Sequence, residues 1–134
     1  MKKKFWNILE KVAIASEPVG RAQLAACLVY KNELISIGTN KYKTHPLAKK
    51  FQKNKNTDCL HAEIDAIKNA LRVVDVDFLA KCTMYILRVK RPDHDHKQYV
   101  HGLSKPCCGC QHAIESFNIK NVYFTTDEGH FGAL

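Results

Sequence analysis

The segment Cys59–Ile67, CLHAEIDAI, decides how the whole chain is interpreted, because it places a histidine and a glutamate two residues apart where a helix begins. Apolar residues follow at the three-to-four-residue spacing of an amphipathic helix, which we expect to run from about His61 to Arg72. A buried helix start has no structural need for the pair His61 and Glu63. The pair therefore indicates a functional site.

A second segment, Lys105–Cys110 (KPCCGC), has the same character. Proline is favoured at helix starts, so we predict a helix from Cys107 to Asn118. Cys107 and Cys110 are three residues apart, which puts both sulfurs on one face, and the positive end of a helix favours the thiolate form that binds metals. Three of the six cysteines crowd into four residues, and with no export signal in view this indicates metal or redox chemistry rather than disulfides.

Taken together, His61, Cys107 and Cys110 offer three metal ligands, with no equally good fourth ligand in view. Structural zinc sites close with four protein ligands, whereas catalytic sites keep one position open for water. We therefore predict that these three residues hold Zn²⁺, which lowers the pKa of bound water to roughly 7. Glu63, beside the open position, would take the proton of that water and pass it to the substrate.

The rest of the chain alternates helices with strands. The predicted elements are a helix over 4–16, a β-hairpin over 22–30 and 34–38, a basic loop over 39–58 with a helical turn near 47–51, and strands over 83–89 and 121–125, with an irregular charged segment up to Lys105. This order predicts one domain over residues 1–134. Its fold would be a three-layer α/β/α arrangement, with a mixed sheet of four to five strands and helices on both faces.

The charge and the hydropathy of the chain indicate which binding partners and which location to expect. The net charge of +8 and the pI near 9.2 indicate an anionic partner, although lysines also simply keep a surface hydrated. Six lysines and no acid fall between Leu34 and Thr57. Apolar runs are too short to span a bilayer, and residues 5–15 contain too many polar residues for a signal peptide, so we expect a cytoplasmic protein without a membrane partner.

The order His61-Ala62-Glu63 followed by Pro106 and the two spaced cysteines matches the H-x-E…P-C-x-x-C signature of zinc deaminases. Over most of its length the chain resembles the cytidine and deoxycytidylate deaminase superfamily. The resemblance implies zinc ligands at His61, Cys107 and Cys110 and a catalytic acid/base at Glu63. It also implies that the backbone N–H of Ala62 binds the ring carbonyl of the base and that Asn40 contacts the sugar.

The same resemblance implies a substrate class. HAE favours the branch of deoxycytidylate, tRNA-adenosine and polynucleotide cytosine deaminases, and within it we favour a free, deoxycytidylate-like nucleotide. The alternatives are cytosine in single-stranded DNA or RNA, adenosine in tRNA, and a non-catalytic zinc module that binds nucleic acid.

Family members are usually homo-oligomers, so we expect the same of this chain. For His94, His96 and His101, a second metal site and a plain hydrated loop are the two alternatives. Only nine residues follow Thr125, where relatives continue with a helix and a strand. This puts a fifth strand in question.

Overall fold

The computed structural model describes residues 3–19, 22–42, 46–51, 60–91 and 98–134. The helices are α1 (Lys3–Ala15), α2 (Pro46–Phe51), α3 (Ala62–Ala70), the 3₁₀ helix η1 (Val76–Lys81) and α4 (Cys108–Ser116). The strands are β1 (Gln23–Tyr30), β2 (Glu33–Thr39), β3 (Thr83–Lys90), β4 (Val100–Gly102), β5 (Asn121–Thr125) and β6 (Phe131–Ala133). All helices and strands predicted from the sequence are present, with ends shifted by no more than two residues.

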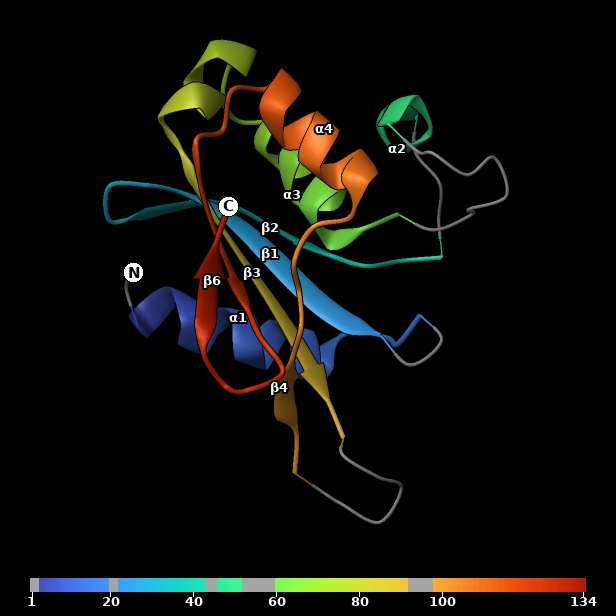
Figure 1. Cartoon of the computed structure of the whole chain (residues 1–134). Helices are drawn as coiled ribbons and strands as arrows, with labels where there is room; N and C mark the ends of the chain where they lie inside the picture. The colour runs from blue at the N-terminus through green and yellow to red at the C-terminus, as the bar shows by residue number, and fades with distance from the viewer. Residues whose placement is uncertain (1–2, 20–21, 43–45, 52–59, 92–97) are drawn as a thin grey trace.

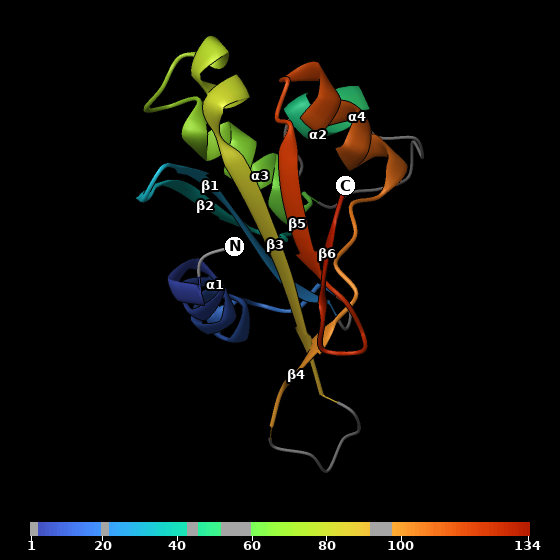
Figure 2. The ribbon, with the colours of Figure 1, turned by 60° about the vertical axis from the view of Figure 1, so that its left-hand side comes forward.

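The strands form one mixed sheet in the order β2-β1-β3-β5-β6, and β4 pairs with the end of β3 (Figure 1). β1 lies between β2 and β3 and is antiparallel to both, whereas β3 and β5 are parallel. Parallel neighbours require a crossover connection. Here that connection contains β4 and α4, which brings α4 onto the same face of the sheet as α3 (Figures 1 and 2).

The sheet is buried on both faces. Ala25, Cys27 and Val29 of β1 pack with α1, and the alternate residues Ala26 and Leu28 pack into the cluster that contains α3. This period of two is the geometry of a strand whose successive side chains point to opposite faces. In Figure 1, α1 (blue) lies on one side of the sheet and α3 (green) and α4 (orange) on the other. The predicted three-layer fold is therefore confirmed.

Two strands were not predicted. β4 forms within the segment that we expected to be irregular, and pairs antiparallel with Arg88–Lys90 at the end of β3. It has three residues, too few to produce a recognisable alternating pattern, so its pairing depends on the extended edge of β3. With β4 the sheet has six strands, one more than the larger predicted number.

The C-terminal segment also forms a strand. β6 pairs antiparallel with β5 after a turn in which Gly129 has a φ of 79°, a value that glycine adopts readily. Gly132 lies against the ring of Phe124, where an added Cβ would come within 2.5 Å of a ring carbon. A short strand with a central glycine carries little sequence signal, but the edge of β5 provides its hydrogen-bonding partner. In the described part of the chain, no helix combines the length and the apolar character needed to cross a bilayer.

Candidate metal centre

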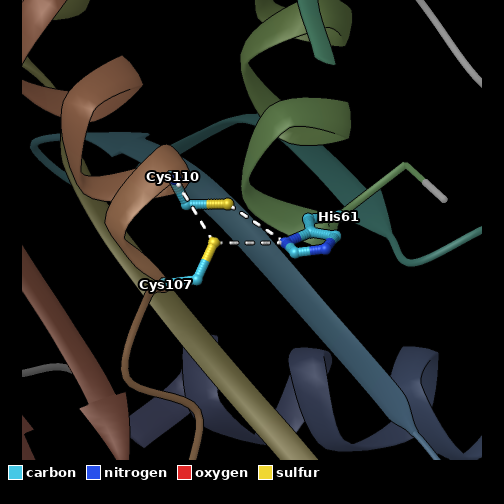
Figure 3. A group of neighbouring side chains, drawn as sticks. All are labelled: His61, Cys107 and Cys110. Carbon is cyan, nitrogen blue, oxygen red and sulfur yellow. Dashed lines mark hydrogen bonds between the residues drawn. The ribbon is translucent and has the colours of Figure 1, made fainter. Parts of the chain in front are cut away.

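His61 lies immediately before α3, at the position that normally caps a helix start. Its side chain makes no capping hydrogen bond, while its carbonyl oxygen accepts the first helical hydrogen bond from the N–H of Asp65 at 3.0 Å. The backbone of His61 therefore belongs to the helix, and its imidazole is directed toward α4 (Figure 3).

Cys107 occupies the corresponding position before α4. Its sulfur accepts a hydrogen bond from the backbone N–H of Cys110 at 3.5 Å, one helical turn later. The side chain of Gln111 donates to the carbonyl oxygen of Pro106 at 2.8 Å and braces the same turn. Both sulfurs consequently face His61, as the spacing predicted (Figure 3).

The three side chains meet at one point. The Nδ1 atom of His61 lies 3.3 Å from the sulfur of Cys110 and 3.6 Å from that of Cys107. In a tetrahedral site with ordinary zinc–sulfur and zinc–nitrogen bond lengths, a nitrogen and a sulfur ligand lie about 3.5 Å apart. The three candidate ligand atoms all lie within 4.8 Å of one another. Their separation and chemistry fit a single zinc ion, and among the described residues no fourth histidine, cysteine or carboxylate joins this group.

The charges of this cluster are uneven. Hydrogen bonds with the Cys110 thiol and with His61 lower the pKa of the Cys107 thiol to about 3, so it is a thiolate at neutral pH. The hydrogen bond with Cys107, and to a smaller extent burial, raise the pKa of the Cys110 thiol. A hydrogen bond with Cys107 also raises the pKa of the His61 imidazole. A metal binds both cysteines as thiolates, so its binding would release a proton from Cys110.

Glu63 lies beside this cluster as the second residue of α3. Only 4% of its surface is exposed, and its carboxyl group interacts with the Cys110 thiol. Burial raises the pKa of Glu63, which favours the protonated form, and its own backbone N–H and the charge of His61 oppose this shift. A buried carboxyl group next to a metal position can accept and return protons without contact with bulk water.

The two predicted substrate contacts lie at the ends of β2 and α3. Ala62 is buried as the first residue of α3. Asn40 is also buried, and its side-chain amide accepts from the N–H of Leu24 and donates to the carbonyl oxygen of Ala22, both at 3.0 Å. This amide closes the open end of the β1–β2 hairpin, a structural role that the sequence did not reveal. Its contact with a sugar stays a prediction.

A buried pair of hydroxyl groups holds the segment that leads into α4. The hydroxyl of Ser104 donates to the carbonyl oxygen of Ile86 at 2.9 Å and accepts the N–H of Thr125 at 2.8 Å. The hydroxyl of Thr125 donates to the carbonyl oxygen of Gly102 at 2.7 Å. Ser104 and Thr125 thereby tie the chain to β3 and β5 three residues before Cys107. No sequence pattern marked either residue.

An ion cluster around Asp65 of α3 was not predicted from the sequence either. Asp65 is 1% exposed, accepts the N–H of Thr39 at 3.0 Å, and forms ion pairs with Lys41 and Lys68. The available signal was a carboxylate within the first turn of a buried helix. A buried carboxylate needs a cationic partner.

The candidate second metal site lies largely outside the described residues. His94 and His96 lie outside the described residues. His101 lies in β4, where its Nε2 atom is 3.8 Å from a carboxylate oxygen of Glu10. Within the described ranges, His101 belongs to no group of three potential metal ligands.

The family described as the cytidine and deoxycytidylate deaminase zinc-binding region matches residues 1–126, which is nearly the whole chain. The chain belongs to this family. Its cofactor is accordingly zinc, and the cluster of His61, Cys107 and Cys110 provides the donor set that such a zinc-binding region requires.

Solved structures show the same fold. The chain is similar to the dCMP deaminase of the cyanophage S-TIM5 in its apo form, with a TM-score of 0.60 and 20% identity over 94% of this chain and 86% of that chain. It is also similar to a structure of this phage dCMP deaminase in complex with dCMP and dUMP, with a TM-score of 0.60 and 16% identity over 94% of this chain and 84% of that chain. No curated protein matches the chain in sequence. At these identities the structural likeness establishes the fold that this deaminase family shares.

Proposed function

We propose that the protein catalyses the zinc-dependent hydrolytic deamination of cytosine in a free nucleotide, deoxycytidylate or a close analogue, with release of ammonia. The observation that carries this proposal is the buried carboxyl group of Glu63 against the His61–Cys107–Cys110 cluster. The deaminase family match and the likeness to a phage enzyme solved with dCMP and dUMP support it.

Each residue of the cluster has a defined role in this proposal. His61, Cys107 and Cys110 hold the zinc ion through one nitrogen and two sulfur atoms. Zinc bound there supplies Lewis acidity, which lowers the pKa of a coordinated water to roughly 7. The hydrogen bonds that keep Cys107 a thiolate prepare one ligand before the metal arrives.

Glu63 is the proposed proton carrier. It takes a proton from the water that attacks C4 of cytosine and delivers this proton to ring atom N3. It then takes the remaining proton of the hydroxyl group at C4 and delivers it to the amine, so that ammonia leaves as the C4 carbonyl of the product forms. Burial raises the pKa of Glu63, which brings the carboxyl group closer to the range in which it can both accept and donate a proton. Ala62 lies in the first turn of α3, where backbone N–H groups have no partner within the helix, and its N–H would bind the ring carbonyl oxygen. Asn40 would contact the sugar.

Replacing Glu63 by alanine tests this assignment. The Glu63→Ala variant should keep stoichiometric zinc, measured by elemental analysis, because Glu63 is not among the three clustered ligands. Its turnover of deoxycytidylate, measured as ammonia release, should fall by about 10²–10⁴-fold, the usual contribution of a general acid/base. Glu115→Ala provides a matched control on the exposed surface of α4 and should keep wild-type activity.

The results of this test separate the alternatives. Zinc-loaded Glu63→Ala with full activity would show that another group carries the proton. A wild-type protein that contains zinc but deaminates no nucleotide or polynucleotide would favour the non-catalytic zinc module. Purified wild-type protein without stoichiometric zinc would contradict the proposed zinc-dependent deaminase activity.

Cytosine in single-stranded nucleic acid is the second candidate substrate. The net charge of +8 favours it, because neutralising several phosphates contributes strongly to affinity at low salt. Incubation of the protein with a cytosine-containing single-stranded oligonucleotide, followed by sequencing, tests this alternative directly. Conversion in the oligonucleotide without ammonia release from deoxycytidylate would replace the free nucleotide as the substrate.

We further propose a homo-oligomer located in the cytoplasm, as the family resemblance and the sequence suggested. The oligomer is tested by analytical ultracentrifugation of the zinc-loaded protein. A single species with the mass of one 15.2 kDa chain would contradict it.

A further inference from the structure

The proposed reaction leaves one buried charged group of α3 without a role. Asp65 lies two residues after Glu63, is 1% exposed, and interacts with two segments that are distant in sequence. One carboxylate oxygen accepts the N–H of Thr39 at 3.0 Å and forms an ion pair with Lys41. The other lies 2.8 Å from the ammonium group of Lys68. A carboxylate at this depth requires such partners, so the cluster is a built feature of the fold.

Lys41 contacts the chain on both sides of His61. Its backbone N–H donates to the carbonyl oxygen of Leu60 at 2.9 Å, and its carbonyl oxygen accepts the N–H of Leu60 at 2.8 Å. Its side chain reaches the carboxylate of Asp65, four residues after His61. One residue at the end of β2 therefore holds both the residue before the proposed zinc ligand and the helical turn that follows it.

These contacts close a ring. Asp65 donates its N–H to the carbonyl oxygen of His61 at 3.0 Å, so Lys41, Leu60, His61 and Asp65 are joined by covalent and hydrogen bonds without a gap. His61 cannot move along the axis of α3, or away from β2, without breaking one of them. We propose that Lys41 and Asp65 form a clasp that positions His61 for the metal and slows the release of zinc. This inference rests on the zinc site of the proposed function.

The ammonium group of Lys41 makes its hydrogen bonds within the protein. A lysine side chain has three donors. The ammonium group contacts the carboxylate of Asp65, the hydroxyl of Thr39 at 2.9 Å and the carbonyl oxygen of Thr39 at 3.5 Å. A lysine at the start of a basic segment could be assigned as a phosphate ligand, but these contacts engage the ammonium group of Lys41 with groups of the protein itself.

Lys68 provides a matched control within the same cluster. It pairs with the same carboxylate, but Lys68 and Asp65 both belong to α3 and are three residues apart. Lys68 thus contributes charge to the cluster without connecting α3 to β2. A comparison of Lys41→Met with Lys68→Met separates the clasp from simple charge neutralisation.

The decisive measurement is the rate at which zinc leaves the zinc-loaded protein for an excess of a chromogenic chelator. We expect Lys41→Met to release zinc about tenfold faster than the wild type or more, since residues that orient metal ligands typically contribute 10–100-fold to metal affinity. Lys68→Met should release zinc at close to the wild-type rate. In the metal-free protein, amide hydrogen exchange of residues 61–65 should accelerate in Lys41→Met and not in Lys68→Met.

Each outcome decides the proposal. Zinc release from Lys41→Met at the wild-type rate, or equal acceleration in both variants, would overturn the clasp. If Lys41→Met does not fold, Lys41→Gln replaces it, because glutamine is polar but shorter and uncharged and so loses the ion pair with Asp65. Zinc release from that variant at the wild-type rate would equally overturn the clasp. If the wild type holds no zinc, the proposed function fails, and hydrogen exchange of the metal-free proteins still tests the clasp by itself.

Discussion

Two adjacent cysteines at the start of α4 have different surroundings. Both residues are exposed, but the sulfur of Cys107 faces His61 within the ligand cluster, whereas Cys108 lies outside the cluster. Sequence alone gives both the same chemistry. Their difference follows from the helical turn that pairs Cys107 with Cys110.

Serine substitutions test this difference. Cys107→Ser should lower zinc affinity more than about 100-fold, beyond the loss typical of residues that merely orient a ligand, because a metal ligand is removed. Cys108→Ser should bind zinc as the wild type does. Competition with a chelator of known affinity measures both. Equal loss in the two variants would show that the ligand cluster is wrongly assigned.

The ion pairs of Asp65 make the free energy of unfolding depend on pH. Burial raises its pKa, but hydrogen bonds from Lys41, Lys68 and the Thr39 N–H lower it more, so its pKa in the folded protein lies below the ordinary value. A carboxyl group with a lowered pKa stabilises the fold above its unfolded-state pKa of about 3.9, and this contribution is lost as the pH falls through the lowered folded value.

The Asp65→Asn variant isolates this contribution. At pH 7 it should be less stable than the wild type by about 1.5–3 kcal/mol, the typical value of hydrogen bonds to a charged group. The difference should stay constant down to about pH 5 and shrink below about pH 4, where the carboxylate of the wild type becomes protonated. Urea unfolding of both metal-free proteins across this range measures it. A difference that does not change with pH would contradict the ion-pair interpretation.

At the scale of elements, the close approach of β2 to α3 sets the position of the site. Gly38 of β2 lies against the first turns of α3, and an added Cβ would come within 2.2 Å of the Ala66 backbone nitrogen and 2.5 Å of the Ala62 carbonyl oxygen. Backbone atoms cannot move aside as a flexible side chain can. The missing side chain of Gly38 therefore allows α3 to lie where His61 and Glu63 reach α4.

Gly38→Ala should separate β2 from α3. We expect a loss of about 3 kcal/mol, at the upper end of the range for overpacked interiors, together with weaker zinc binding. Gly102→Ala is the control, because its added Cβ would meet the side chains of Arg88 and Lys90, which can move. Thermal unfolding and zinc content of the two variants measure the effect. Similar stability of both variants would contradict the close approach.

At the scale of the whole molecule, the two ends of the described chain pack together. Trp6 of α1 stacks on Phe131 of β6 with ring centroids 4.5 Å apart, and Trp6 also makes an edge contact with Tyr85 of β3. This contact joins the first helix to the last strand across one face of the sheet. It explains how a three-residue strand is held in place.

The emission of the single tryptophan reports on this contact. In Phe131→Ala the emission of Trp6 should shift to the red as water reaches the ring, and the protein should lose about 1 kcal/mol, the usual worth of an aromatic pair. Val73→Ala, at a site 68% exposed after α3, should change neither quantity. Unchanged emission in Phe131→Ala would show that β6 does not cover Trp6.

Most of the fold and the ligand cluster could be predicted because their signals are local. His61 and Glu63 are two residues apart and Cys107 and Cys110 three, so the geometry of a single helical turn largely determines how each pair projects. The alternation of apolar residues in β1 likewise follows from the period of one strand. The geometry within each pair needs no knowledge of distant segments, whereas the meeting of His61 with the two cysteines was expected from the combined signature of both segments.

By itself, the sequence determined the zinc ligands' chemistry, the order of helices and strands, and the three layers, since each depends on short-range spacing and apolar periodicity. Only the tertiary structure decided that Asn40 closes a hairpin, that Lys41 pairs with the buried Asp65, and that β4 and β6 extend the sheet. The physical reason is that these features are contacts between segments far apart in the chain. Such contacts are set by how the layers pack, and a polar residue in isolation does not reveal which backbone or charge it will meet.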